Sequence, residues 1–184
     1  MTRRANTRTP LSATVYDSGA VLDCSGTYRY TLWRCWNASG PRAGFILLNP
    51  STADATRDDP TLRRCMAFAH AWGFGGVQVV NLFAFRTPNP VHLRAAADPV
   101  GPENDRHILE ASSRCAFLVA GWGTCATAAQ RAEYVLSLLA EQTIYCLGRT
   151  KSGSPRHPLY VSGNVCPLPF RPLIASRDSA PGHS

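Results

Sequence analysis

The chain has 184 residues, of which 45% are hydrophobic and 17% are charged, and its formal net charge is +7. This length suits one domain with a sizeable core and is too short for two comfortable ones. The composition is ordinary for a globular protein, and no apolar stretch approaches the roughly 20 residues that a membrane-spanning helix requires. These observations exclude a membrane-embedded chain and predict a single cytoplasmic domain.

The two ends of the chain differ from its middle. Residues 1–12 carry arginines but no apolar segment behind them, which predicts a short disordered basic arm rather than a secretory signal. Residues 171–184 are rich in small and polar residues and are expected to form a disordered tail. Residues 13–170 are therefore predicted to form one α/β domain.

The first part of this domain is predicted to be a small antiparallel β meander. Residues 13–36 combine β-branched and aromatic residues with Asp-Ser-Gly and Cys-Ser-Gly turns. That combination is typical of short antiparallel strands. We expect the meander to cover one edge of the main sheet.

Short apolar runs follow the meander; they occupy residues 44–48, 77–81, 116–120 and 143–147. Such runs are typical of strands that are buried on both faces of a parallel sheet. Helical patterns separate them, at residues 58–74, 101–115 and 126–142. The alternation predicts βαβ units with right-handed crossovers. The expected architecture is a three-layer α/β/α domain with a central four-stranded, mainly parallel sheet, in addition to the meander.

Polar and aromatic residues gather at the expected strand ends, where ligands bind in open α/β sheets. In chain order these ends are Asn49-Pro50-Ser51, Asn81-Leu82-Phe83-Ala84-Phe85-Arg86, Gly121-Trp122-Gly123 and Gly148-Arg149-Thr150, the last of which reaches Arg156-His157-Pro158. Aromatic faces stack on a flat ring, amides bind its edge, and arginines hold phosphate. The pattern predicts a pocket for a hydrogen-bonding ring with a phosphate attached.

These strand ends resemble the motifs of a known superfamily. The segments ILLNPST, VVNLFAFRTPNP, FLVAGWG and RHPLY, in that order, look like the strand-end motifs of the uracil-DNA glycosylase superfamily. Residues 20–165 look still closer to DUF1643, a bacterial and phage family of unknown function. The resemblance implies a uracil-DNA glycosylase-like fold. It also implies an enzyme that hydrolyses the N-glycosidic bond of a modified or mismatched base in DNA.

The resemblance and the strand-end positions together assign roles to particular residues. Asn49 and His157 are the catalytic candidates, since Asn49 would hold or polarise the water and His157 would stabilise negative charge on the departing base. The base or ligand would be bound by Pro50, Ser51, Asn81, Phe83, Phe85 and Trp122. Phosphate or DNA would be contacted by Arg63, Arg86, Arg149, Lys151, Arg156, Pro158 and Leu159.

Other interpretations stay open at this point. Asn49 stands where the most active family members have Asp, which permits a module that binds a modified base or nucleic acid without cutting it. Asp54 and Asp58 would then either replace that carboxylate or cap the helix that begins near Pro60. The even spread of charge along the chain also fits an enzyme that acts on free nucleotides or nucleosides.

Partners and cofactors are indicated only by composition. Lys151 is the only lysine, and the arginine bias suits a nucleic-acid partner, DNA more than RNA. The seven cysteines include no C-x-x-C pair, so their spacing suits neither a zinc ribbon nor an iron–sulfur cluster. We expect no metal and no cofactor, and the oligomeric state is left open.

Overall fold

The computed structural model of the protein describes residues 16–171. The predicted basic arm, and the predicted tail beyond Arg171, lie outside the described residues. In chain order the elements are β1 (Asp17–Leu22), β2 (Arg29–Cys35), β3 (Arg42–Leu47), α1 (Pro60–Ala71), β4 (Gly76–Asn81), α2 (Pro90–Ala95), α3 (Asn104–Ser113), β5 (Phe117–Ala120), the 3-10 helix η1 (Ala126–Ala128), α4 (Ala129–Leu138), β6 (Ile144–Cys146), the 3-10 helix η2 (Pro158–Tyr160) and β7 (Leu168–Arg171).

One seven-stranded sheet organises these elements, in the order β1-β2-β4-β3-β5-β6-β7. The pairs β3–β4, β3–β5 and β5–β6 are parallel, whereas β1–β2, β2–β4 and β6–β7 are antiparallel. The predicted α/β class is therefore confirmed, but the sheet is a single mixed sheet of seven strands in place of a four-stranded, mainly parallel sheet with an additional meander. The meander is not separate, because β2 pairs directly with β4. Strand β7 was not predicted, since Pro169 lacks the N–H that a ladder uses and fits only an edge strand.

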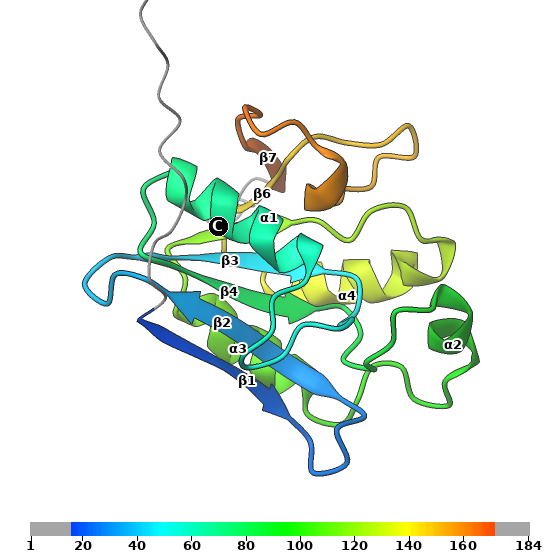
Figure 1. Ribbon diagram of the computed structural model, residues 1–184. Coiled ribbons are helices and arrows are strands. Elements are labelled where there is room, and N and C mark those ends of the chain that lie inside the picture. Colours follow the sequence, from blue (N-terminus) through cyan, green and yellow to red (C-terminus); the bar gives the residue numbers. More distant parts are fainter. Residues whose placement is uncertain (1–15, 172–184) are drawn as a thin grey trace, which may run out of the picture.

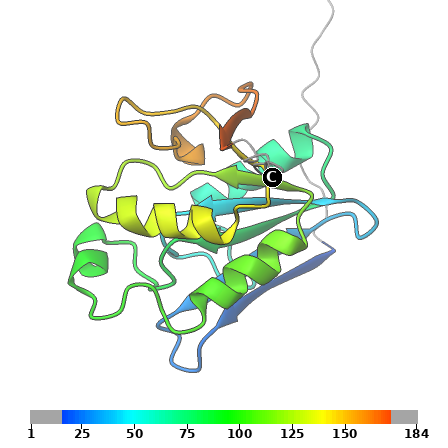
Figure 2. The same ribbon diagram turned by 180° about the vertical axis from the view of Figure 1, so that it is seen from behind.

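Helices cover both faces of the sheet. Figure 1 shows α1 in front of the sheet, and Figure 2, from behind, shows α3 and α4 on the opposite face. Phe45 and Phe68 belong to the core beneath α1, whereas Ile108 and Val135 belong to the core beneath α3 and α4. No helix within residues 16–171 is long and apolar enough to cross a membrane.

The start of α1 is fixed by its capping residue. Asp59 accepts a hydrogen bond from the backbone N–H of Leu62 at 2.7 Å, and Pro60 supplies a backbone angle suited to the first turn. The helix then packs on the sheet through Leu62, Cys65 and Phe68. This arrangement holds the N-terminal end of α1 at the carboxyl edge of β3 and β4.

Candidate functional site

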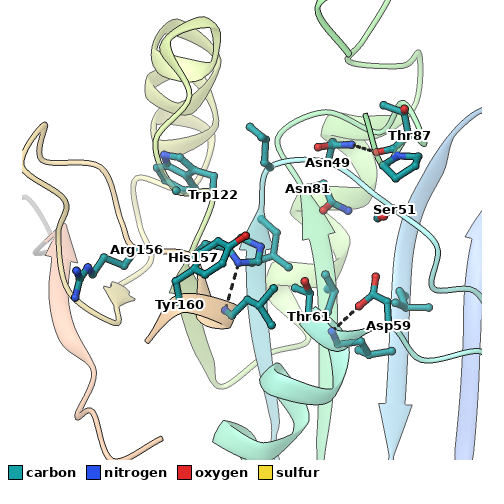
Figure 3. A pocket seen from close by; sticks show the side chains of 18 of the residues that line it. Asn49, Ser51, Asp59, Thr61, Asn81, Thr87, Trp122, Arg156, His157 and Tyr160 are labelled. Carbon is teal, nitrogen blue, oxygen red and sulfur yellow. Dashed lines mark hydrogen bonds between the residues drawn. The ribbon is translucent and has the colours of Figure 1, made fainter. Parts of the chain in front are cut away.

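A cavity of about 620 Å³ lies at the carboxyl edge of the parallel strands. Its walls come from the ends of β3, β4, β5 and β6, together with the starts of α1 and β2. The predicted site residues that line it are Asn49, Ser51, Asn81, Trp122, Arg156, His157 and Leu159. Its volume lies within the range of roughly 300–1,000 Å³ that small-molecule sites occupy. Figure 3 shows the two asparagines on one side of the cavity and the rings of Trp122 and His157 on the other.

Asn49, just beyond β3, is held in one orientation. Its Nδ2 donates to the carbonyl oxygen of Pro50 at 3.0 Å. It also donates to the carbonyl oxygen of Thr87 at 2.7 Å (Figure 3). Both partners are acceptors only, so the amide nitrogen must face them and Oδ1 is left to accept a further hydrogen bond. An ionised aspartate at this position would face two carbonyl oxygens with no proton to donate.

Asn81 is the last residue of β4 and is almost fully buried, with 1% of its surface exposed. Neither its Nδ2 nor its Oδ1 has a hydrogen-bond partner among residues 16–171. The large majority of buried side-chain polar atoms in native proteins are hydrogen-bonded, and leaving one unpaired destabilises the fold. The amide of Asn81 therefore has an unused donor and an unused acceptor at the wall of the cavity.

His157 presents a neutral imidazole to the cavity. Its Nδ1 accepts from the backbone N–H of Leu159 at 3.3 Å, which leaves the proton of the neutral ring on Nε2. Burial lowers the pKa of His157, and the charge of Asp59 opposes this shift. At neutral pH the ring is therefore a hydrogen-bond donor through Nε2.

The glycines around Trp122 shape the wall that β5 provides. A Cβ at Gly121 would lie 2.9 Å from Cδ of Pro158, so glycine lets the His157 segment lie close to the end of β5. Gly123 has a φ of 72° and donates its N–H to the carbonyl oxygen of Pro155 at 2.9 Å. The Gly-Trp-Gly motif thus brings the end of β5 close to residues 155–158, the segment after β6 that contains His157.

The cavity also contains a carboxylate that was not predicted, that of Asp59. The sequence feature that could have identified Asp59 is the Asp-Asp-Pro motif, in which either aspartate could cap α1. Asp58 instead forms an ion pair with Arg34 at 2.8 Å, and Asp54 accepts from the backbone N–H of Thr56 at 2.9 Å. Of these three aspartates, only Asp59 lines the cavity. Within the described chain, no three His, Cys, Asp or Glu side chains are grouped to hold a metal ion.

Arg29, at the start of β2, is the second charged residue that was missed. Its guanidinium is buried, and Nη1 donates to the carbonyl oxygen of Ala53 at 2.7 Å. Burial lowers the pKa of Arg29 to about 10 despite the opposing charge of Asp59. The cavity therefore contains a cation at neutral pH.

Three of the predicted ligand-binding residues do not line the cavity. Phe83 is buried in the core beneath α3 and α4, and Phe85 packs edge-on against Tyr28 with 6.3 Å between ring centroids. Pro50 is buried and contributes its carbonyl oxygen to Asn49. Trp122 is the aromatic ring at a strand end that lines the cavity, and it also packs against Phe170.

The residues predicted to contact phosphate or DNA are scattered. Arg156 and Leu159 are exposed at the cavity, whereas Pro158 is buried beside it and Lys151 is exposed and does not line it. The remaining three arginines mainly bind backbone carbonyl oxygens of their own surroundings; these pairs are Arg63 with Asp58, Arg86 with Ser51, and Arg149 with Phe170. Arg86 thereby supports the loop that contains Ser51.

The fold and the cavity define an α/β protein with a cavity at the carboxyl edge of a mixed sheet. Residues 29–159 match the family described as "Protein of unknown function (DUF1643)". This match covers most of the chain, so the chain belongs to that family, as predicted. It includes every cavity residue described above. No curated protein and no solved structure matches the chain. The resemblance to the uracil-DNA glycosylase superfamily stays a prediction.

Proposed function

We propose that the chain binds a nucleobase in this cavity and hydrolyses its N-glycosidic bond, with a modified or mismatched base in DNA as the substrate. The observation that carries the proposal is the unpaired, buried amide of Asn81, which shares a cavity with the neutral ring of His157. The edge of a nucleobase presents a donor next to an acceptor, and an amide side chain can form hydrogen bonds with both. The two rings on the opposite wall suit a flat ligand.

The arrangement of the sheet supports the same proposal. The adjacent strands β4, β3, β5 and β6 run parallel, and the cavity lies at their carboxyl ends. A uracil-DNA glycosylase-like domain would place its base-binding motifs at this edge. The fold by itself assigns no activity, so the proposed function rests on the side chains of the site.

In the proposed reaction, water attacks the anomeric carbon of the sugar while the bond to the base nitrogen breaks. Negative charge develops on the base, and the Nε2–H of His157 donates to its carbonyl oxygen, a bond that strengthens in the transition state. Oδ1 of Asn49 accepts a hydrogen bond from the water. The carboxylate of Asp59 takes one proton of the water while the hydroxyl bonds to the anomeric carbon. The base leaves as an anion that takes a proton from solvent, and Asp59 releases its proton to solvent.

Incubating the full chain with DNA that carries a panel of modified and mismatched bases, and cleaving abasic sites with alkali, tests this function. We expect abasic sites for at least one base, and a loss of about 100-fold or more in rate for His157→Gln. His92→Gln, which changes an exposed histidine on α2 outside the cavity, serves as the control. Equal rates for His157→Gln and the wild type, or no abasic sites with any base, would refute the proposed reaction. Base-selective binding without cleavage would support a binding module instead.

A further inference from the structure

The guanidinium of Arg29 has no role in the proposed reaction, although it lines the same cavity. Its residue surface is 3% exposed, and the ion pairs found within residues 16–171 do not include it. Its Nε is buried without a hydrogen-bond partner in that part of the chain. Buried charges in proteins are usually paired, because removing an ion from water costs several kcal/mol. The unpaired cation therefore indicates a group that the ligand supplies.

Arg34, on the same strand, shows what such a guanidinium binds when it is paired. Arg34 is as buried as Arg29, with 2% exposed. Its Nε and Nη2 both contact Oδ1 of Asp58 at 2.8 Å. In Arg29 the equivalent edge, formed by Nε and Nη2, has no hydrogen-bond partner among the described residues, and Nη1 alone is used. This edge is the planar fork with which arginine binds carboxylates and phosphates side-on.

A β-bulge in β2 turns Arg29 toward the cavity. Val21 pairs with Thr31 but Leu22 pairs with Arg29, so Tyr30 is the additional residue. Tyr30 stacks on His107 of α3, on one face of the sheet, whereas Leu32 lines the cavity on the other face. Regular alternation would place Arg29 and Leu32 on opposite faces, and the bulge puts them on the same one.

The carboxylate that shares the cavity does not fill the free edge. Asp59 is held by the N–H of Leu62 at the start of α1, and it forms no ion pair with Arg29. The carbonyl oxygen of Ala53 occupies only Nη1. The edge formed by Nε and Nη2 is thus left without a partner in the described chain, at the wall of the cavity and next to the end of β4 that carries Asn81.

We propose that Arg29 is an anion-binding subsite and that the natural ligand of this cavity carries a phosphate or a carboxylate, which binds the edge formed by Nε and Nη2. This inference goes beyond the proposed function, since it concerns the charge of the ligand and holds whether or not a glycosidic bond is cut. A free nucleotide supplies a phosphate, and a carboxylated base supplies a carboxylate.

Isothermal titration calorimetry with matched neutral and anionic probes tests the subsite. One arm compares each common nucleoside with its 5′-monophosphate, and the other compares uracil with orotate, which is uracil carrying a carboxylate. We expect the anionic member to bind the full chain at least about tenfold more tightly in one arm, the gain typical of a charge-assisted bidentate pair. Which arm shows the preference identifies the source of the anion.

Variants of Arg29, which is unpaired, and of Arg34, which is paired, show which residue causes the preference for anionic probes. Arg29→Gln is expected to remove the preference, and Arg29→Lys, which keeps the charge without the fork, to retain part of it. Arg34→Gln, the control on the same strand, is expected to keep it. Equal binding of neutral and anionic probes in both arms, or a preference that survives Arg29→Gln, would overturn the proposal. If Arg29→Gln does not fold, a competition titration of the wild type with inorganic phosphate tests the subsite instead. Phosphate should compete with the anionic probe and not with the neutral one. Calorimetry measures binding, whereas the abasic-site assay measures cleavage. The anion subsite and the proposed reaction can therefore be refuted separately.

Discussion

Replacing Asn81 with leucine removes the unpaired amide and keeps a similar side-chain volume. Both polar atoms of Asn81 are buried without a partner in the described chain, and each unsatisfied group destabilises a fold by about 1–3 kcal/mol. Leucine would bury apolar surface in their place. Because the leucine must fit a site shaped for an amide, we expect a net gain of about 2 kcal/mol in the free energy of unfolding. For a protein of this size the gain corresponds to a rise of roughly 4–8 °C in melting temperature.

The matched control is Asn104→Leu. Asn104 is also fully buried, but its Nδ2 donates to the carbonyl oxygens of Asn81, at 3.1 Å, and Leu82, at 3.0 Å. Removing it takes this donor from the carbonyl oxygen of Asn81, whereas Leu82 keeps its bond from Nε of Arg131 at 2.8 Å. This variant should therefore lose about 1–2 kcal/mol.

Urea and thermal unfolding measure the two variants, and calorimetry with nucleosides and bases measures binding. Asn81→Leu should be more stable than the wild type and should lose base binding by at least about tenfold. If Asn81→Leu is destabilised as much as Asn104→Leu, the amide of Asn81 is satisfied in the ligand-free protein. The reasoning that it is reserved for a ligand would then be refuted.

Three further predictions concern the walls of the cavity. Asn49→Asp should lower the free energy of unfolding by about 2–3 kcal/mol at pH 7.5. Part of this loss should be recovered at pH 5, because a protonated carboxyl can again donate to a carbonyl oxygen. Thermal unfolding at the two pH values measures the difference. Burial lowers the folded-state pKa of His157 below its ordinary value of 6.5, so its contribution to stability is complete above that value and is lost as the pH falls below it. Urea unfolding from pH 7.5 to 5 should therefore show a weaker pH dependence for His157→Gln than for the wild type, and an unchanged dependence would contradict the assignment. Gly121→Ala should displace the His157 segment and weaken ligand binding while the far-ultraviolet circular dichroism stays unchanged, and unaltered affinity would argue against the close approach.

The sequence was sufficient to locate the cavity because buried parallel strands leave continuous apolar runs. The residue after such a run must lie at the carboxyl edge of the sheet, and Asn49, Asn81 and Trp122 are there. Phe83 could not be placed in this way. Its backbone N–H continues the ladder by donating to the carbonyl oxygen of Leu48 at 3.0 Å, which keeps the ring in the core.

The two charged residues of the cavity depend on details that periodicity does not encode. Asp59 and its neighbour Asp58 are equivalent candidates for the cap of α1, and only the ion pair of Asp58 with Arg34 separates them. Arg29 lies three positions before Leu32, so alternation predicts opposite faces for the two residues. The bulge that reverses this prediction follows from how β1 and β2 pair, which no local pattern in β2 specifies.

The bulge at Tyr30 makes the presence of a cation in this cavity depend on how β1 and β2 pair. Inserting one residue into β1 between Val21 and Leu22 would give Tyr30 a partner and restore regular alternation, which would turn Arg29 to the face beneath α3. A relative with such a regular pairing would lack the guanidinium in its cavity. Within this family, a one-residue insertion in β1, a strand that contributes no residue to the cavity wall, could therefore remove the positive charge of the cavity.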